Sequence, residues 1–242
     1  MTREEMIKEI KMSNPFLLSL TYATNEEVSR RYKEIMGKPE EGTIITLYHG
    51  SDKEVKVEDI ILPGPRKECD FGAGFYLTDR REIAEEWVCN KDNPIVNEYR
   101  LDISKETILH LEDRDWLHVV LAHRDSLCKV RFKSNVIVGE IADDKLFQSL
   151  SAFSDGLIGD KRLINAIKIC DLGKQYIFKN NVKGLSFVRF IKMDDISLDL
   201  ARKRKNNRRA GLRKSISNVY KTLIVGEEFY DDYEKKGDYV EY

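Results

Sequence analysis

The sequence predicts an α+β fold, and two observations support this. Short strands rich in β-branched and aromatic residues are mixed with charged helices, without the regular order of βαβ winding. Of the 242 residues, 41% are hydrophobic and 34% are charged, which is typical of a globular protein with a heavily charged surface. We expect a helical N-terminal extension (1–42), a central domain (43–195), and a basic helix followed by an acidic tail (196–242).

The N-terminal extension is predicted to contain two helices. Residues 3–13 and 24–37 have the apolar spacing of amphipathic helices, and Asn25 is a typical residue to start the second. The extension lacks the apolar segment of a signal peptide, and no apolar run in the chain is long enough to span a bilayer. The sequence therefore predicts a cytoplasmic protein with no membrane partner.

The central domain is predicted from apolar spacing to mix short strands with helices. The strands are expected at residues 43–49, 74–78, 95–103, 107–111, 135–141 and 175–178. The helices are expected at residues 79–90, 115–123, 143–153 and 160–170. Thr78 or Asp79 is the expected N-cap of the first helix. Beyond residue 178 we expect mainly helix, including a long helix that begins in the basic stretch and ends near residue 224.

Two tripeptides of the chain also occur in protein kinases, DFG at 70–72 and HRD at 123–125. In kinases HRD precedes DFG, and an Asn follows the HRD Asp to hold a metal ion. Here the order is reversed, and Lys129 stands at the Asn position. We therefore exclude a kinase, and interpret HRD as a helix end and DFG as a turn.

The net charge of -1 excludes a global basic field for nucleic acid, but the charge is unevenly distributed. Residues 202–214 hold eight basic and no acidic residues, whereas residues 227–242 hold seven acidic residues. The basic stretch either binds nucleic acid or an acidic partner, or forms a solvated helix face paired with the acidic tail, and the second interpretation is favoured. No metal site is expected, because the chain has no C-x-x-C pair and its later histidines, His110, His118 and His123, lack metal-ligand spacing.

Polar residues mark one end of three predicted strands. The first ends in YHGS (48–51), where the glycine lets another group approach the backbone closely. The second follows two glycines in GAGFY (72–76), which permit a tight turn that holds an aromatic ring in a cleft. The third opens with Gln175. Taken singly, each is more simply explained by a turn or by core packing, and Trp87 is also expected in the core.

Together and in this order, these segments resemble known enzymes. LYHGS, DFGAGFYLT and QYIF are similar to the His, Tyr and Glu strands of ADP-ribosyltransferases of the diphtheria-toxin and poly-ADP-ribose-polymerase branch. With PIVNEYRLD and VIVGEIADDKLF, they resemble more closely a bacterial family of small ADP-ribosyltransferase-like domains, from about residue 45 to residue 190. The resemblance implies an ADP-ribosyltransferase-like fold of two small packed sheets, mixed or antiparallel, with flanking helices, and NAD as substrate.

The resemblance also implies roles for individual residues. His49 would hydrogen-bond a ribose hydroxyl, Gly50 would bind the nicotinamide carboxamide through its backbone, and Tyr76 would stack on the nicotinamide ring. Gln175 takes the place of the family glutamate, so the predicted catalytic residues are His49, Tyr76 and Gln175. The residues expected to contact NAD are His49, Gly50, Ser51, Arg66, Asp70, Phe71, Gly74, Tyr76, Thr78 and Asp143.

Several of these residues also have a structural interpretation. Arg66 either binds the pyrophosphate or lies in a solvated loop. Asp70 either anchors that loop or caps the turn, and Phe71 is expected to pack beneath it. Thr78, just before a helix, is placed to face a phosphate or the adenine ribose. Asp143 either caps a helix or contributes a carboxylate to the site.

Gln175 departs from the family pattern in a way that affects catalysis. Cleavage of the nicotinamide–ribose bond develops an oxocarbenium-like cation, which a carboxylate stabilises better than an amide dipole does. The loss costs on the order of 2–4 kcal/mol and favours slow, single-site transfer over chain elongation. Glu140, Asp143 and Asp144 are candidates for the missing carboxylate.

The resemblance thus implies a mono-ADP-ribosyltransferase that transfers ADP-ribose from NAD to a macromolecule, with protein favoured over nucleic acid as the acceptor. It also implies a bacterial toxin, effector or defence protein, with an antitoxin or regulatory partner, and with delivery into a target cell's cytoplasm as a second location. Two alternatives stay open. One is a non-catalytic module that binds NAD or ADP-ribose, which Gln175 favours, and the other is an NAD glycohydrolase that passes ADP-ribose to water.

Overall fold

The structure is a computed structural model of the whole chain. It describes residues 44–62, 69–103, 108–125, 129–142, 146–170, 172–179, 185, 187–234 and 239–242, together with a few isolated positions before residue 26. The helices expected at 3–13 and 24–37 lie almost entirely outside the described residues. Three of the residues discussed above, Arg66, Asp143 and Asp144, also lie outside them.

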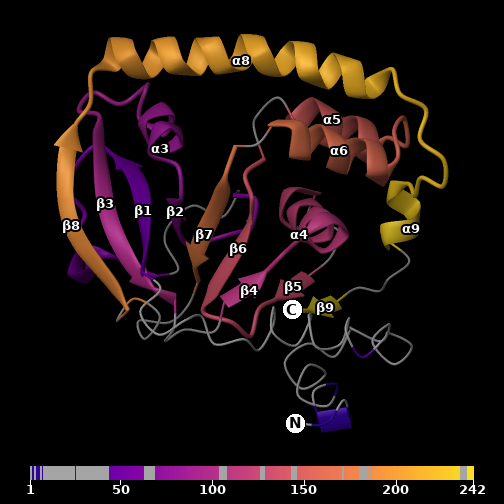
Figure 1. The fold of residues 1–242 in the computed structure, drawn as a ribbon, viewed down its shortest axis with the longest axis horizontal. Coiled ribbons are helices and arrows are strands. Elements are labelled where there is room, and N and C mark those ends of the chain that lie inside the picture. Colours follow the sequence, from indigo (N-terminus) through magenta and orange to yellow (C-terminus); the bar gives the residue numbers. More distant parts are fainter. Residues whose placement is uncertain are drawn as a thin grey trace.

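Seven strands form one mixed sheet in the order β4-β6-β7-β2-β1-β3-β8 (Figure 1). Their bounds are β1 (Ile44–Ser51), β2 (Phe75–Thr78), β3 (Ile95–Asp102), β4 (Ile108–His110), β6 (Val136–Glu140), β7 (Lys174–Phe178) and β8 (Val188–Asp195). A separate parallel pair joins β5 (Lys129–Arg131) to β9 (Tyr239–Glu241). The predicted α+β class is confirmed.

The large sheet is joined weakly at its centre. β1 pairs with β3 at all eight of its residues. Towards β2, in contrast, β1 has one paired residue, Tyr48 opposite Thr78. The sheet therefore consists of a three-stranded half (β1, β3, β8) and a four-stranded half (β2, β7, β6, β4) that meet at this pair. Two packed sheets were expected, and the structure has one sheet with a narrow junction instead.

Helices cover the junction of the two halves and the four-stranded half, and one long helix crosses above both (Figure 1). α3 contacts β1 and β2, whereas α4, α5 and α6 lie over the four-stranded half. α8 contacts α3 and also α6. The helices are η2 (Val57–Asp59, a 3-10 turn), α3 (Arg81–Trp87), α4 (Asp113–Asp125), α5 (Leu146–Ser154), α6 (Asp160–Cys170), α8 (Leu198–Tyr220) and α9 (Tyr230–Glu234).

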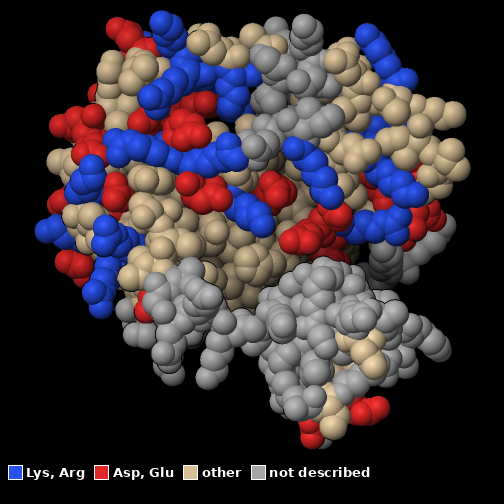
Figure 2. All heavy atoms as spheres, in the orientation of Figure 1, with Lys and Arg blue, Asp and Glu red and all other residues tan. Residues whose placement is uncertain are grey.

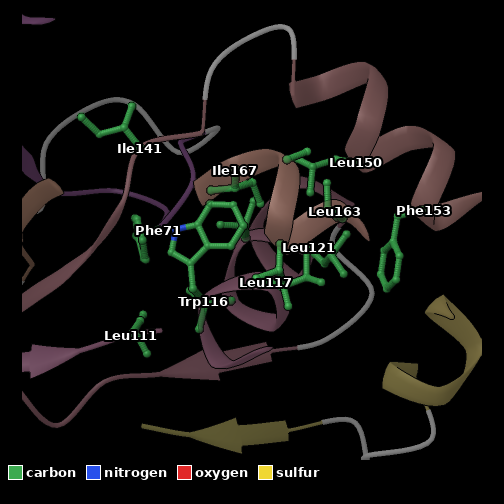
Figure 3. Packing of buried hydrophobic residues seen from close by; sticks show 14 of the residues in the cluster. Phe71, Leu111, Trp116, Leu117, Leu121, Ile141, Leu150, Phe153, Leu163 and Ile167 are labelled. Carbon is green, nitrogen blue, oxygen red and sulfur yellow. The ribbon is translucent and has the colours of Figure 1, made fainter. Parts of the chain in front are cut away.

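Two clusters of buried side chains form the core, one on each face of the sheet. The first lies between the four-stranded half and α4 to α6 (Figure 3), and includes Phe71, Trp116, Leu117, Ile137 and Phe153. The indole N–H of Trp116 donates to the Glu140 carbonyl at 2.8 Å, so the polar atom of this buried ring is satisfied. The second cluster includes Leu47, Leu77, Tyr99, Val138 and Phe178.

The C-terminal third differs most from the sequence expectation. β8 occupies residues 188–195, where mainly helix was expected. It is an edge strand that exposes Ile191 and Met193 and carries charged residues, so it lacks the alternation that marks a half-buried strand. α8 begins at Leu198 and ends at Tyr220, four residues before the expected end.

The start of α3 also differs from the expectation, because its N-cap is Arg80 and not Thr78 or Asp79. The Thr78 hydroxyl accepts a hydrogen bond from the Arg80 N–H at 3.1 Å. The Asp79 carboxylate accepts one from the Lys174 N–H at 2.9 Å. Asp79 therefore joins the end of β2 to the start of β7 instead of capping the helix.

Among the side chains that the structure describes, the basic stretch of α8 forms ion pairs with α3 and none with the acidic tail. Arg204 forms an ion pair with Glu85, and Arg208 forms one with Glu86 at 2.6 Å. Both glutamate side chains are buried. The acidic tail pairs elsewhere, in the ion pairs Glu227–Arg162 and Glu228–Arg114. Basic and acidic side chains are accordingly intermixed on the face shown in Figure 2.

Within the described residues, no helix is long and apolar enough to cross a membrane. The same residues contain no group of His, Cys, Asp and Glu side chains arranged to hold a metal ion. Two of the histidines interpreted as structural have partners in the fold. His118 Nδ1 lies 2.7 Å from the Tyr242 hydroxyl, and His123 Nδ1 lies 2.8 Å from the Val119 carbonyl oxygen.

Candidate functional site

β1 carries His49 and Gly50 just beyond the junction between the two halves of the sheet. They directly follow Tyr48, the residue that pairs with β2. His49 Nδ1 lies 2.8 Å from the Tyr76 carbonyl oxygen, and Nδ1 carries the proton because a carbonyl can only accept. Nε2 is then an acceptor whenever the imidazole is neutral. The ring also contacts Phe75, with 4.6 Å between the ring centroids.

Helix α3 lies directly on Gly50. A Cβ atom at this position would be 2.4 Å from the Ala84 carbonyl oxygen and 3.3 Å from the Trp87 Cβ. The close approach predicted from this glycine is therefore made by a helix of the same chain. Trp87 was expected in the core, but it is 38% exposed, so that expectation is wrong. It is the last residue of α3, and the other residues of its apolar spacing, Ile83, Ala84 and Val88, are buried.

The DFG segment forms a tight turn that the Tyr76 side chain closes. Gly72 has a φ of 70°, in the left-handed region that favours glycine, and its N–H donates to the Cys69 carbonyl at 2.8 Å. The Tyr76 hydroxyl donates to the Gly72 carbonyl at 2.6 Å and accepts from the Phe71 N–H at 3.2 Å. The interpretation of DFG as a turn is confirmed.

Tyr76 is partly buried, and its ring packs against the first core cluster. Burial raises the pKa of its hydroxyl, and the nearby Cys69 acts in the same direction. The hydroxyl therefore stays protonated at physiological pH and remains a hydrogen-bond donor to the turn. In this arrangement Tyr76 fixes the shape of residues 70–72.

Gln175 is the second residue of β7, opposite Thr78 of β2 and Gly139 of β6. It is buried, with 3% of its surface exposed. Its Nε2 donates to Asp70 Oδ2 at 3.2 Å and to the Glu140 carbonyl at 3.0 Å. The side chain in the place of the family glutamate thus contacts a carboxylate that lies 105 residues earlier in the chain.

Lys179 and His123 close the other side of the DFG turn. The buried ammonium of Lys179 donates to the Phe71 carbonyl and lies 5.2 Å from the centroid of the Phe132 ring. Burial lowers the pKa of Lys179 to about 8. A Cβ on Gly72 would lie 2.5 Å from the His123 ring, so this ring leaves room for glycine alone. Burial also lowers the pKa of His123.

The three predicted catalytic residues lie on neighbouring strands but not on one face. Successive residues of a strand point to opposite faces, and Tyr76 packs against the first cluster whereas Phe75 packs against the second. Gln175 shares the Tyr76 face, because Ile177 of the same strand also packs in the first cluster. His49 contacts Phe75, so its ring lies on the opposite face.

The other predicted site residues occupy the ends of β1 and β2. The Ser51 hydroxyl accepts from the Lys53 N–H at 3.3 Å. Gly74 directly precedes β2, and Thr78 ends it with its side chain buried. Phe71 is fully buried in the first cluster, in agreement with its expected position beneath the turn.

Sequence reasoning missed Trp87, Lys179 and the contact between Asp70 and Gln175. Trp87 belongs to the apolar spacing of residues 83, 84 and 88, which favoured a core position. Lys179 follows directly after β7, where a lysine carries no signal of burial. The contact between Asp70 and Gln175 depends on the pairing of β7 with β2, which spacing along the chain does not indicate.

Comparison with known proteins identifies a family without an assigned activity. Residues 45–190 match the model of a family described as "Protein of unknown function (DUF3990)", and this range is more than half of the chain. The chain belongs to this family. Searches of curated proteins and of solved structures returned no match. All of the residues from His49 to Lys179 that form the candidate site lie within the matched range.

Proposed function

We propose that the protein is an NAD-dependent mono-ADP-ribosyltransferase that transfers ADP-ribose to a macromolecule, with protein favoured as the acceptor. The proposal includes an ADP-ribosyltransferase-like fold for residues 43–195, and a role as a bacterial toxin, effector or defence protein with an antitoxin or regulatory partner. One observation carries it. LYHGS, GFYLT and QYIF, which are far apart in the sequence, lie on the adjacent strands β1, β2 and β7.

Groups at the end of β1 fit the nicotinamide half of NAD. His49 Nε2, as the acceptor nitrogen of a neutral imidazole, suits a ribose hydroxyl. The exposed indole of Trp87, next to Gly50, offers an aromatic surface on which a nicotinamide ring can stack. Because β1 and β2 pair at one residue, a ligand at this junction can meet groups from both faces of the sheet.

The surroundings of Tyr76 favour a supporting role for this residue. Its hydroxyl is bonded within the DFG turn, and its ring packs against the core. We therefore assign the stacking role to Trp87. We assign to Tyr76 the role of holding the DFG turn in position. The neutral Gln175 favours the alternative of a binding module without turnover, and the experiment must separate the two.

Incubation with NAD labelled on the adenylate separates the candidate functions. Label on protein supports transfer to protein, label on nucleic acid supports that acceptor, and free ADP-ribose supports a glycohydrolase. Binding of NAD without turnover supports the module. If wild-type protein neither binds nor consumes NAD, the proposal is wrong.

Trp87→Ala and His49→Ala test the site itself. We expect each to weaken NAD binding about 5- to 150-fold, since a stacked ring or a lost hydrogen bond is worth on the order of 1–3 kcal/mol. Phe229→Ala is the matched control, because Phe229 is 41% exposed and lies in the segment before α9. If Trp87→Ala binds NAD as tightly as Phe229→Ala does, the stacking assignment fails.

A further inference from the structure

A buried glutamine next to a carboxylate occupies the place where the resemblance expects a glutamate. Gln175 Nε2 lies 3.2 Å from Asp70 Oδ2. A glutamate at position 175 would bring two carboxylates together in a buried setting, where like charges repel strongly. The amide removes this repulsion and donates to the carboxylate. A neutral donor such as Gln175 therefore suits this position better than a glutamate does when Asp70 is present.

The DFG turn fixes Asp70 from several sides. The next residue, Phe71, is fully buried, and its carbonyl accepts from the Lys179 ammonium. The Phe71 N–H and the Gly72 carbonyl are both bonded to the Tyr76 hydroxyl. A carboxylate attached to this turn is held in place before a substrate arrives, as electrostatic catalysis requires.

The other described candidate for the missing carboxylate is less well placed. Glu140 offers its backbone carbonyl to Gln175. Its neighbour Gly139 is the residue that pairs with Gln175, and Val138 packs in the second cluster. Strand alternation therefore places the Glu140 side chain on the face opposite to Gln175. Asp70 is 3.2 Å from the Gln175 amide and is partly exposed, so solvent and a substrate can reach it.

We propose that Asp70 is the catalytic carboxylate of this protein and that Gln175 positions it. The enzymes that the chain resembles carry this negative charge on a glutamate at the position of Gln175, whereas here it comes from the DFG turn. This inference rests on the proposed function. The bond between the nicotinamide nitrogen and ribose C1′ breaks, its electron pair goes to the nicotinamide, and neutral nicotinamide leaves. Asp70 stabilises the cationic ribose. The acceptor nucleophile then bonds to C1′ and loses its proton to solvent.

A charge swap tests this assignment. Asp70→Asn should lower the rate of nicotinamide release about 100-fold, since removal of one electrostatic stabiliser typically costs that much. NAD affinity, measured by calorimetry, should change less than about threefold. The double variant Asp70→Asn/Gln175→Glu returns the carboxylate to the strand and should recover at least a tenth of the wild-type rate. Asp155→Asn, an exposed residue after α5, is the matched control.

A stability measurement checks the contact without reference to activity. Gln175→Glu alone should lower the melting temperature at pH 7 by about 5 °C, because it places two carboxylates side by side. The loss should disappear at pH 4, and also when Asp70→Asn is combined with it. The comparison of Gln175→Glu with wild type at pH 7 and pH 4 remains informative if Asp70→Asn alone folds poorly.

The outcomes separate this inference from the function on which it rests. If wild-type protein neither binds nor cleaves NAD, both are wrong. If wild type cleaves NAD and Asp70→Asn does so within threefold of it, the Asp70 assignment alone is wrong. A swap variant no faster than Asp70→Asn, or a Gln175→Glu variant as stable as wild type at pH 7, also contradicts it.

Discussion

Two groups of buried polar side chains in this protein are built differently. In the first, which we call the α9 network, fully buried Asp160 bonds to Tyr233 and forms an ion pair with Arg114. In the second, around the DFG turn, the buried polar groups are the neutral Gln175 and the cationic Lys179, whose pKa burial lowers to about 8.

The difference indicates separate roles. The α9 network pairs its buried charge with opposite charge and hydrogen bonds, and it fastens the C-terminal segment to α6 and α4. The DFG turn holds the Lys179 ammonium through the Phe71 carbonyl in a low-dielectric setting, and it also carries the partly exposed Asp70 carboxylate. Titratable groups are perturbed in both places, because burial also raises the pKa of Tyr233 in the α9 network, so the distinction rests on the contact between Asp70 and Gln175 at the DFG turn. We therefore assign stability to the first group, and under the proposed function the chemistry belongs to the second.

Loss of the Asp160 carboxylate should have the largest effect on stability. Asp160→Ala removes the acceptor for the Tyr233 hydroxyl and for the Glu228 N–H, and it removes the counter-ion of Arg114. We expect the free energy of unfolding in urea to fall by about 3–5 kcal/mol. Asp155→Ala, with its exposed side chain, should change it by less than about 0.5 kcal/mol. A loss below about 1 kcal/mol for Asp160→Ala would contradict the structural role of the network.

The effect of pH on Lys179 should be next in size. Its pKa is about 8 in the folded protein, against an ordinary value of 10.5, so the unfolded chain binds more protons between these pH values. Stability due to this residue therefore rises as the pH increases from 8 to 10.5, by about 1–3 kcal/mol. Urea unfolding at pH 7 to 10 should show this rise in wild type relative to Lys179→Met.

The comparison of wild type with Lys179→Met removes the contributions of the tyrosines, which titrate in both proteins. The groups that face Lys179 are Cys69 and His123, and the ring of Phe132 lies beside it. A difference between the two proteins that stays flat from pH 7 to pH 10 would show that the ammonium is not buried in the folded state.

Removal of the Arg208 side chain should have an effect of similar size that is more local. Arg208→Ala leaves the buried Glu86 carboxylate without its ion-pair partner on α8. We expect a loss of about 1–3 kcal/mol in stability, together with faster hydrogen exchange of the α3 backbone amides. Lys203→Ala, at an exposed position of the same helix, is the matched control. Equal behaviour of the two variants would contradict the role of the basic stretch in holding α3.

Much of the fold could be predicted from the sequence, because apolar strands carry a local signal. β1, β2, β3, β6 and β7 appear close to the expected positions. The short strands β5 and β9 were not expected, since three residues carry no pattern and the pair forms between segments far apart in the chain. The pairing of α8 with α3 depends in the same way on contacts that form only in the folded protein.

Some features of the candidate site could be predicted and others could not, because several of them depend on contacts between segments far apart in the chain. The turn at Gly72 and the burial of Phe71 follow from local sequence, and the structure agrees with both. Trp87 is exposed although its apolar spacing with the buried Ile83, Ala84 and Val88 indicated the core. The contact between Asp70 and Gln175 depends on strand pairing, so the sequence alone suggested other carboxylates.

Hydrogen exchange with and without NAD tests the central claim most directly. The account predicts that saturating NAD slows exchange at residues 48–51, at residues 69–78 and in α3, and leaves α6 and α9 unchanged. Protection that appears instead in the α9 network, or no change at any of these segments, would contradict the assignment of chemistry to the DFG turn and the end of β1.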